Sequence, residues 1–149
     1  MENSILKTIQ IKAPVSQIWQ AITIPEQMQK WMGEIDFNMK ITTDWTPGKP
    51  IVIEGFHHVH FVNSGIVLAY DFEKKLSYNY LSSISRLPDK PENYTELEFT
   101  LEPGEEQTTL TLILRNFPND SIYQHVNFYW NGTLLLLRDF ILHKMQISI

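Results

Sequence analysis

The final stretch of the chain, residues 121–147, carries the pattern that most restricts how the protein can fold. Apolar residues recur there at steps of three or four, and they are Tyr123, Val126, Trp130, Leu134, Leu137, Ile141 and Met145. This spacing predicts one amphipathic helix of about 25 residues, which would be roughly 37 Å long. A helix of that length needs a long apolar surface to cover, so we expect it to span a whole sheet.

Three features of this segment predict details of the helix. Ser121 and Gln124 form a capping box, in which each side chain satisfies a free backbone N–H, so the helix is expected to start there. Residues 134–137 are all leucine, which predicts that this turn meets protein on more than one side. Gly132 costs about 1 kcal/mol relative to alanine, a cost usually offset by close packing or a bend.

The surface under the helix is predicted by the middle of the chain, where the apolar period changes to two residues. Such a period is typical of antiparallel strands. The six expected strands lie near residues 35–43, 50–57, 60–70, 75–83, 94–102 and 107–116. Thr46–Lys49 and Glu102–Glu105 place proline and glycine where a type II turn needs them. In the last two strands leucines alternate with glutamates and threonines, so one sheet face should be covered and the other wet.

The start of the chain predicts one more strand and two short helices. Within 5–11, Ile5, Lys7, Ile9 and Ile11 alternate with more polar residues, which is typical of a strand. Pro14 suits the first position of a helix, and the apolar residues that follow it recur at helical spacing up to Ile22. A second helix is expected from Pro25 to Gly33, with Gly33 as the left-handed residue that ends it.

Length and composition limit the kinds of protein that this chain can be. The 149 residues suit one domain, 1–149, with one core. Cysteine is absent, which excludes disulfide scaffolds, thiolate metal sites and cysteine nucleophiles. The net charge of −5 disfavours nucleic acid as a partner. With no signal-peptide pattern and no apolar run near the roughly 18 residues of a membrane span, we expect a cytoplasmic protein without a membrane partner.

Short motifs near both ends of the chain resemble one protein family. The opening motifs are Ala13-Pro14, Ile18-Trp19, Ala21-Ile22-Thr23, Pro25-Glu26 and Lys30-Trp31. They resemble the opening signature of the activator of Hsp90 ATPase homolog 1-like family. Thr109–Leu112 resembles the final strand of that family, and Trp130 with Leu134 and Leu137 resembles its last helix. Two positions depart from it: Gly48-Lys49-Pro50 stands where a glycine pair is common, and Tyr129 stands where a glycine often precedes the helix tryptophan.

The resemblance implies an α+β helix-grip fold of the Bet v 1/START-like superfamily. In that fold a strand, two helices and six further strands form a curved seven-stranded antiparallel sheet, which grips a long C-terminal helix. A cavity between sheet and helix holds apolar small molecules in many members. We therefore predict an apolar or amphipathic ligand, bound by Trp19, Trp31, Phe56, His57, Tyr78, Phe99, Leu114, Trp130, Leu134 and Leu137.

Other interpretations of the same residues stay open. Any one of these aromatic residues could simply pack in the core, which is the commoner reason for burying one. Tyr78 and Tyr80 share a parity, so their hydroxyls could anchor a ligand or reach water. The family name implies a second function, contact with a chaperone whose ATPase it stimulates. A homodimer, or a small enzyme that uses the same cavity with His57 as acid or base, is also compatible with the sequence.

The histidines of residues 57–60 are the most chemically suggestive motif. In an extended strand His58 and His60 would share a face with Glu54, which could offer two imidazoles and a carboxylate to a metal. His57 has the opposite parity and could reach the cavity. Spacing alone does not make a metal site, so we predict none, and no cofactor. The motifs of hydrolases, zincins, NTPases and dinucleotide enzymes are absent from the sequence, so no catalytic residue is predicted.

Overall fold

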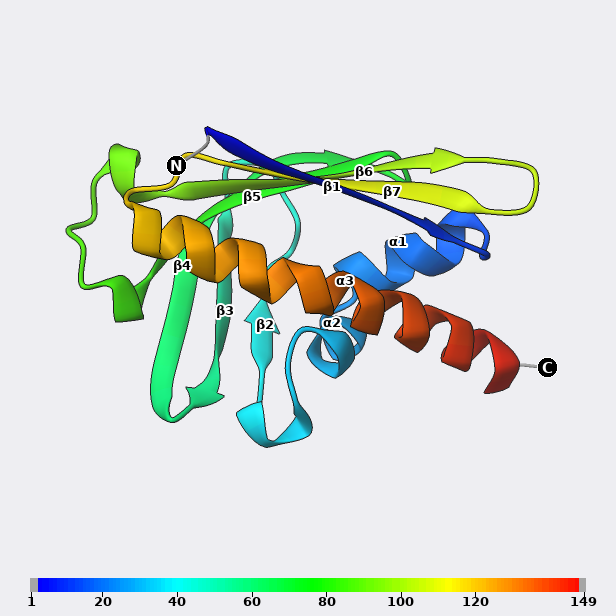
Figure 1. Cartoon of the computed structure of the whole chain (residues 1–149), viewed down its shortest axis with the longest axis horizontal. Helices are drawn as coiled ribbons and strands as arrows, with labels where there is room; N and C mark the ends of the chain where they lie inside the picture. The colour runs from blue at the N-terminus through cyan, green and yellow to red at the C-terminus, as the bar shows by residue number, and fades with distance from the viewer. Residues whose placement is uncertain (1–2, 148–149) are drawn as a thin grey trace.

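The computed structural model describes residues 3–147. Within this range, seven strands and three α-helices follow one another in the order that the sequence predicts (Figure 1). Three short 3-10 helices, labelled η, were not predicted. The elements are β1 (Ser4–Ile11), α1 (Val15–Thr23), α2 (Pro25–Trp31), η1 (Ile35–Phe37), β2 (Lys40–Thr42), β3 (Pro50–His57), β4 (Val59–Asp71), β5 (Lys75–Ser82), η2 (Ser83–Ser85), η3 (Pro91–Asn93), β6 (Thr95–Pro103), β7 (Thr108–Arg115) and α3 (Asp120–Ile147).

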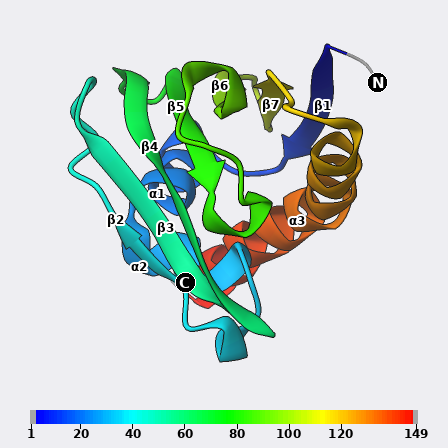
Figure 2. The same ribbon diagram turned by 90° about the vertical axis from the view of Figure 1, so that its left-hand side faces the viewer.

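The strands form one antiparallel sheet in the order β1-β7-β6-β5-β4-β3-β2. Figure 2 shows the sheet bending so that α3, α1 and α2 lie on its concave side. β1 and β2 are the two edges, and β1 runs beside α3. This arrangement confirms the predicted helix-grip fold.

The core lies between the concave face of the sheet and the helices. Facing pairs on β6 and β7, such as Leu97 with Leu114 and Phe99 with Leu112, are buried there. Leu137 and Ile141 of α3 are also fully buried. Each side chain of this size stabilises the fold by about 1.5–3 kcal/mol when it is removed from water, so the long helix and the sheet depend on each other.

The edge strand β2 is much shorter than predicted. Residues 35–43 were expected to be extended, but Ile35–Phe37 forms the 3-10 helix η1, and only Lys40–Thr42 pairs with β3. Asn38, with φ of 49°, lies between the two in a left-handed conformation that interrupts an extended backbone. A single turn of 3-10 helix is too short to leave its own period in the sequence, which explains the error.

Turns and helix ends confirm some predictions and correct others. Gly48 has φ of 87°, and the Lys49 N–H donates to the Thr46 carbonyl at 2.9 Å, as a type II turn requires. The next expected turn is displaced, because the Gly104 N–H donates to the Gln107 carbonyl. Gly33 does not adopt the expected left-handed conformation, and α2 ends with Met32 as its C-cap.

The long helix starts earlier than its predicted capping box. The side-chain oxygen of Asn119 accepts a hydrogen bond from the Ile122 N–H at 2.9 Å, so Asn119 caps the helix. Ser121 consequently lies inside the first turn of α3. Among residues 3–147, none of the helices combines the length and the apolar character that crossing a bilayer requires.

Candidate functional site

The ten residues predicted to hold a ligand fall into two groups in the structure. Eight are buried between the sheet and the helices, and they are Trp19, Trp31, Tyr78, Phe99, Leu114, Trp130, Leu134 and Leu137. Phe56 and His57 instead lie at the far end of β3, where both are exposed. The structure therefore does not bring all ten around one cavity, and ligand contact by the buried eight stays a prediction.

Phe56 and His57 are near the tip of the β3–β4 hairpin, which extends away from α3 (Figure 1). The His57 ring is exposed and stacks on the half-buried Phe37, with 4.5 Å between ring centroids. His57 thus lies at the rim of the molecule rather than among the buried side chains. An acid–base role for this imidazole would have to act at the exposed hairpin.

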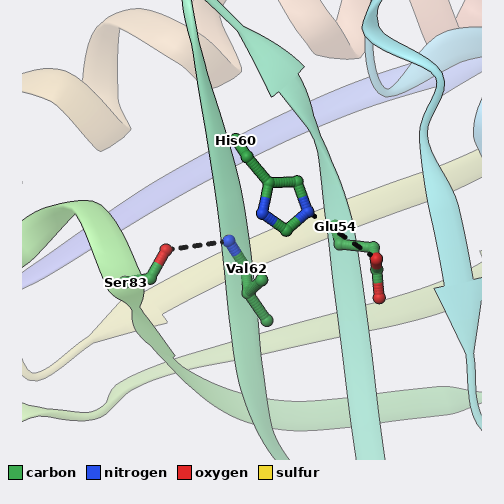
Figure 3. A network of polar contacts seen from close by, with 4 residues as sticks. All are labelled: Glu54, His60, Val62 and Ser83. Atoms are coloured by element: carbon green, nitrogen blue, oxygen red, sulfur yellow. Dashed lines mark hydrogen bonds and ion pairs between the residues drawn. The ribbon is translucent and has the colours of Figure 1, made fainter.

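His58 and His60, the other two histidines of residues 57–60, do not share a strand face as expected. His58 has φ of 66° and forms the turn between β3 and β4, so the strand parity ends before it. His60 pairs with Glu54 across the hairpin at 3.8 Å, as Figure 3 shows beside the hydrogen bond from the Val62 N–H to Ser83. Within residues 3–147, no group of three histidine, aspartate or glutamate side chains is placed to hold a metal ion.

Aromatic rings pack closely under the middle of α3. The Trp130 ring lies 6.2 Å from Trp31, 5.8 Å from Phe99 and 5.1 Å from Tyr129, measured between centroids. The Trp31 indole N–H donates to the Ala21 carbonyl at 2.8 Å, which satisfies its one polar group. These contacts fix Trp130 between the sheet and α2.

Three tyrosines of this region have phenols that are removed from water. Burial raises the pKa of Tyr78, and the nearby Tyr80 and Tyr129 raise it further. Burial also raises the pKa of Tyr80 and of Tyr129, although a hydrogen bond with the Thr133 side chain lowers that of Tyr129. All three are therefore neutral near pH 7 and can act only as hydrogen-bonding groups.

The hydroxyls of these tyrosines differ in their partners. Tyr129 donates to the backbone carbonyl of Met32, whereas no hydrogen bond is formed by the hydroxyl of Tyr78 or Tyr80 with another residue of the described range. Every fully buried side-chain nitrogen or oxygen of that range has a partner. That the Tyr78 and Tyr80 hydroxyls anchor a ligand stays a prediction. Tyr129 was not among the predicted site residues. The sequence did mark this position, because a tyrosine stands there in place of the glycine that is common in the family.

A groove of about 360 Å³ runs between the edge strand β1 and helix α3. Half of its lining is apolar, and the other half is polar or positively charged. The lining residues are Lys7, Thr8, Ile9, Trp130, Asn131, Leu134, Leu135 and Arg138. Trp130 and Leu134 are the two predicted ligand residues that reach it, and Trp130 links it to the buried aromatic rings.

The polar residues of this β1–α3 groove were not predicted as a site. Lys7 donates from Nζ to the side-chain oxygen of Asn131, which joins β1 to α3. Partial burial lowers the pKa of Lys7. A sequence signal for this residue did exist, because Lys7 shares the inward parity of Ile5 and Ile9, where a charged side chain is unusual.

A second hollow, of about 180 Å³, lies over β4, β5 and the segment that follows them. Three apolar residues and three serines line it, and they are Val62, Ser64, Leu81, Ser82, Ser83 and Leu87. None of the predicted ligand residues and no charged side chain lines it. The β1–α3 groove is therefore the better candidate site.

Comparisons with known proteins agree with this fold. A protein from Chromobacterium violaceum, CV1439, is similar in structure with a TM-score of 0.81 and 20% identity, covering 95% of this chain and 98% of its own. ChR145 from Cytophaga hutchinsonii has a TM-score of 0.76 and 26% identity, over 98% and 99% of the two chains. The Aha1 dimer from Colwellia psychrerythraea has a TM-score of 0.73 and 24% identity, over 94% and 96%.

A search of curated proteins gives no match. The family model described as activator of Hsp90 ATPase homolog 1-like protein matches residues 12–141. This match covers α1, α2, six of the seven strands and most of α3. The chain therefore belongs to the activator of Hsp90 ATPase homolog 1-like family.

Proposed function

We propose that the protein binds a small amphipathic molecule in the β1–α3 groove. The observation that carries this proposal is the groove itself, because its volume of about 360 Å³ lies in the range of roughly 300–1,000 Å³ that small-molecule sites occupy. Such sites are mostly apolar with a few polar groups that orient the ligand. In this groove four residues supply apolar surface, and four others supply polar groups that could orient a ligand, namely Lys7, Thr8, Asn131 and Arg138.

The apolar part of the ligand would lie on Ile9 and Leu135. The small exposed parts of Trp130 and Leu134 would complete this surface. The Trp130 ring packs against Phe99 and Trp31, so this wall of the groove is rigid in the absence of a ligand. Binding therefore needs little ordering of side chains. β1 is an edge strand, and no further strand covers its free side. A ligand could therefore enter beside β1 without displacing a strand.

Filling the groove tests this proposal directly. The neutral fluorescent probe N-phenyl-1-naphthylamine would be titrated into the wild type and into Leu134→Trp, whose larger side chain should occupy the groove. We expect affinity to fall by at least tenfold. Leu136→Trp is the matched control, because Leu136 is on the same helix but is exposed and outside the groove lining. Equal affinity of wild type and Leu134→Trp would contradict the proposal.

A second candidate function, contact with another protein, is supported by the outward face of α3. Phe128 is 81% exposed, and Leu136, about two turns further along α3, is 55% exposed. Large apolar side chains in one exposed stripe favour a protein interface. The similar protein from Colwellia psychrerythraea is a dimer, so we propose a second copy of this chain as the partner.

The mass of the particle in solution tests this second proposal. Light scattering after gel filtration should give a dimer for the wild type and a monomer for Phe128→Asp, while Phe72→Asp, at an exposed phenylalanine outside α3, should stay dimeric. A monomeric wild type at all concentrations tested would refute the homodimer. A chaperone partner is distinguished by a pull-down with the host Hsp90, in which retention that depends on Phe128 would favour that partner over a second copy.

A further inference from the structure

We infer that the β1–α3 groove selects a ligand with an anionic head group, held between Lys7 and Arg138, and an apolar tail that lies on the apolar half of the lining. This inference rests on the proposed function and specifies the chemical class of the ligand. The occupant is a free monomeric amphipath, such as a medium-chain carboxylate.

The charge of the groove is opposite in sign to that of the protein. The whole chain carries a formal charge of −5, yet the charged residues among the eight that line the groove are one lysine and one arginine. No aspartate or glutamate lines it. A concave site lined by one sign of charge raises the local concentration of ions of the other sign.

Lys7 has no carboxylate partner in the described chain. The acceptor of its ammonium group is the neutral side-chain oxygen of Asn131. Its partial burial lowers its pKa because the charged form is poorly solvated there. An anion placed in the groove would supply the missing opposite charge and strengthen this interaction.

Arg138 is only weakly engaged by its neighbour. Its Nε lies 3.6 Å from a carboxylate oxygen of the exposed Asp139, which is outside the groove lining. A solvent-exposed ion pair of this length contributes little. The guanidinium has five donors in a planar fork, so most of them stay available to a carboxylate in the groove.

The apolar half of the lining limits the rest of the ligand. Ile9, Trp130, Leu134 and Leu135 form that half. Leu135 is exposed, whereas Trp130 and Leu134 present only a small part of their side chains to the groove. A groove of about 360 Å³ is near the lower end of the usual range for small-molecule sites. A single medium-length chain or a small ring system therefore suits it better than a two-chain lipid.

Two ligands with the same apolar tail and different head groups test the anionic head group separately from the proposed function. Binding of decanoate and of decan-1-ol would be measured by titration calorimetry at pH 7.5 and low salt, below the concentration at which decanoate forms micelles. We expect decanoate to bind at least tenfold more tightly, since a charge-assisted contact adds to the same tail burial. The advantage should shrink at 0.5 M salt because the groove is open to screening ions.

Charge-removing variants then assign the head-group contact. Lys7→Gln and Arg138→Gln should each weaken decanoate by about tenfold and leave decan-1-ol unchanged, which also shows that the groove is intact. Lys12→Gln, at an exposed lysine just after β1, is the control and should change neither ligand. Equal affinities of decanoate and decan-1-ol for the wild type would overturn the anionic head group and leave the proposed function standing. Binding of neither ligand would overturn both.

Discussion

The two flanks of helix α3 differ in how tightly they meet the rest of the molecule. On the flank toward α1 and α2, Tyr129 donates to Met32, and Lys144 donates to the Gln17 carbonyl at 3.1 Å and to the Gln27 side chain at 2.7 Å. On the flank toward β1, the hydrogen bond between Lys7 and Asn131 crosses a groove of about 360 Å³. One helix thus provides a closed flank that stabilises the fold and an open flank, where we propose that a ligand binds.

The largest expected effect comes from removing a ring on the closed flank. Trp31→Ala should reduce the free energy of unfolding by about 3–5 kcal/mol, because a buried tryptophan loses both its contacts and its volume. Leu135→Ala, on the open flank and 47% exposed, should cost less than about 1 kcal/mol. Urea unfolding of both variants measures the difference. If Trp31→Ala does not fold, Trp31→Phe takes its place in the comparison. Trp31→Phe should still be less stable than Leu135→Ala.

Alkaline pH should lower the stability of the fold through three tyrosines under α3. Burial raises the pKa of Tyr78, Tyr80 and Tyr129 above that of an unfolded tyrosine, near 10. The unfolded chain therefore loses these protons first, so their contribution to stability is complete below pH 10 and falls as pH rises above it. Each group should lose about 1.4 kcal/mol per pH unit there.

Absorbance of tyrosinate near 295 nm against pH, with circular dichroism on the same samples, checks this expectation. The three buried phenols should ionise together with unfolding, while exposed tyrosines ionise earlier. Tyr80→Phe should move the alkaline unfolding midpoint to higher pH. Ionisation of all six tyrosines near pH 10 with the fold intact would show that the interior under α3 is open to water.

One hydrogen bond on each flank gives a matched and smaller test. Tyr129→Phe leaves the buried carbonyl of Met32 without its donor, which should cost about 1–3 kcal/mol. Asn131→Ala removes the link to Lys7 in an exposed position, and it should change stability by no more than about 0.5 kcal/mol. Thermal unfolding of the two variants is the measurement. Equal losses would mean that the two flanks contribute alike and that the comparison is wrong.

The smallest expected effect is a gain in stability at Gly132. A Cβ added at this position would meet no other atom within 4 Å, so the close packing that usually explains a helix glycine is missing. Gly132→Ala should therefore stabilise the monomer by about 0.5–1 kcal/mol and raise Tm by a few degrees. If a second copy packs on the outward face of α3, the same variant should weaken the dimer. A loss of monomer stability would indicate that the helix needs a bend here.

The fold could be predicted because its elements have clear periods. The leucines of residues 97–101 and 110–114, and the three- and four-residue steps of α3, each permit one arrangement of an apolar face. Residues 35–43 could not be predicted in this way, because one turn of 3-10 helix is too short to leave its own period in the sequence. The start of α3 was misplaced because Asn119 and Ser121 are both good caps, and only the folded backbone shows which one accepts the hydrogen bond.

The site was harder to predict than the fold. Trp130 and Leu134 line the groove, because their positions on the inner face of α3 follow from helical spacing, and their contact with a ligand stays a prediction. Phe56 and His57 have the right residue types, but the hairpin carries them away from α3, and no local pattern states how far a hairpin extends. Lys7 was recognisable only as a charge at an inward position. A groove depends on how far a helix axis stands from an edge strand, and spacing along the chain does not specify that distance.

The lysine at the centre of β1 has one more consequence. β1 is an outer strand with an unpaired side, and such strands tend to add onto strands of other molecules and grow into aggregates. A charged side chain in the middle of the strand opposes this growth, because a newly added neighbour would enclose it without water. Lys7 therefore discourages uncontrolled polymerisation, and a variant that replaces it with an apolar residue would have to be handled at low concentration.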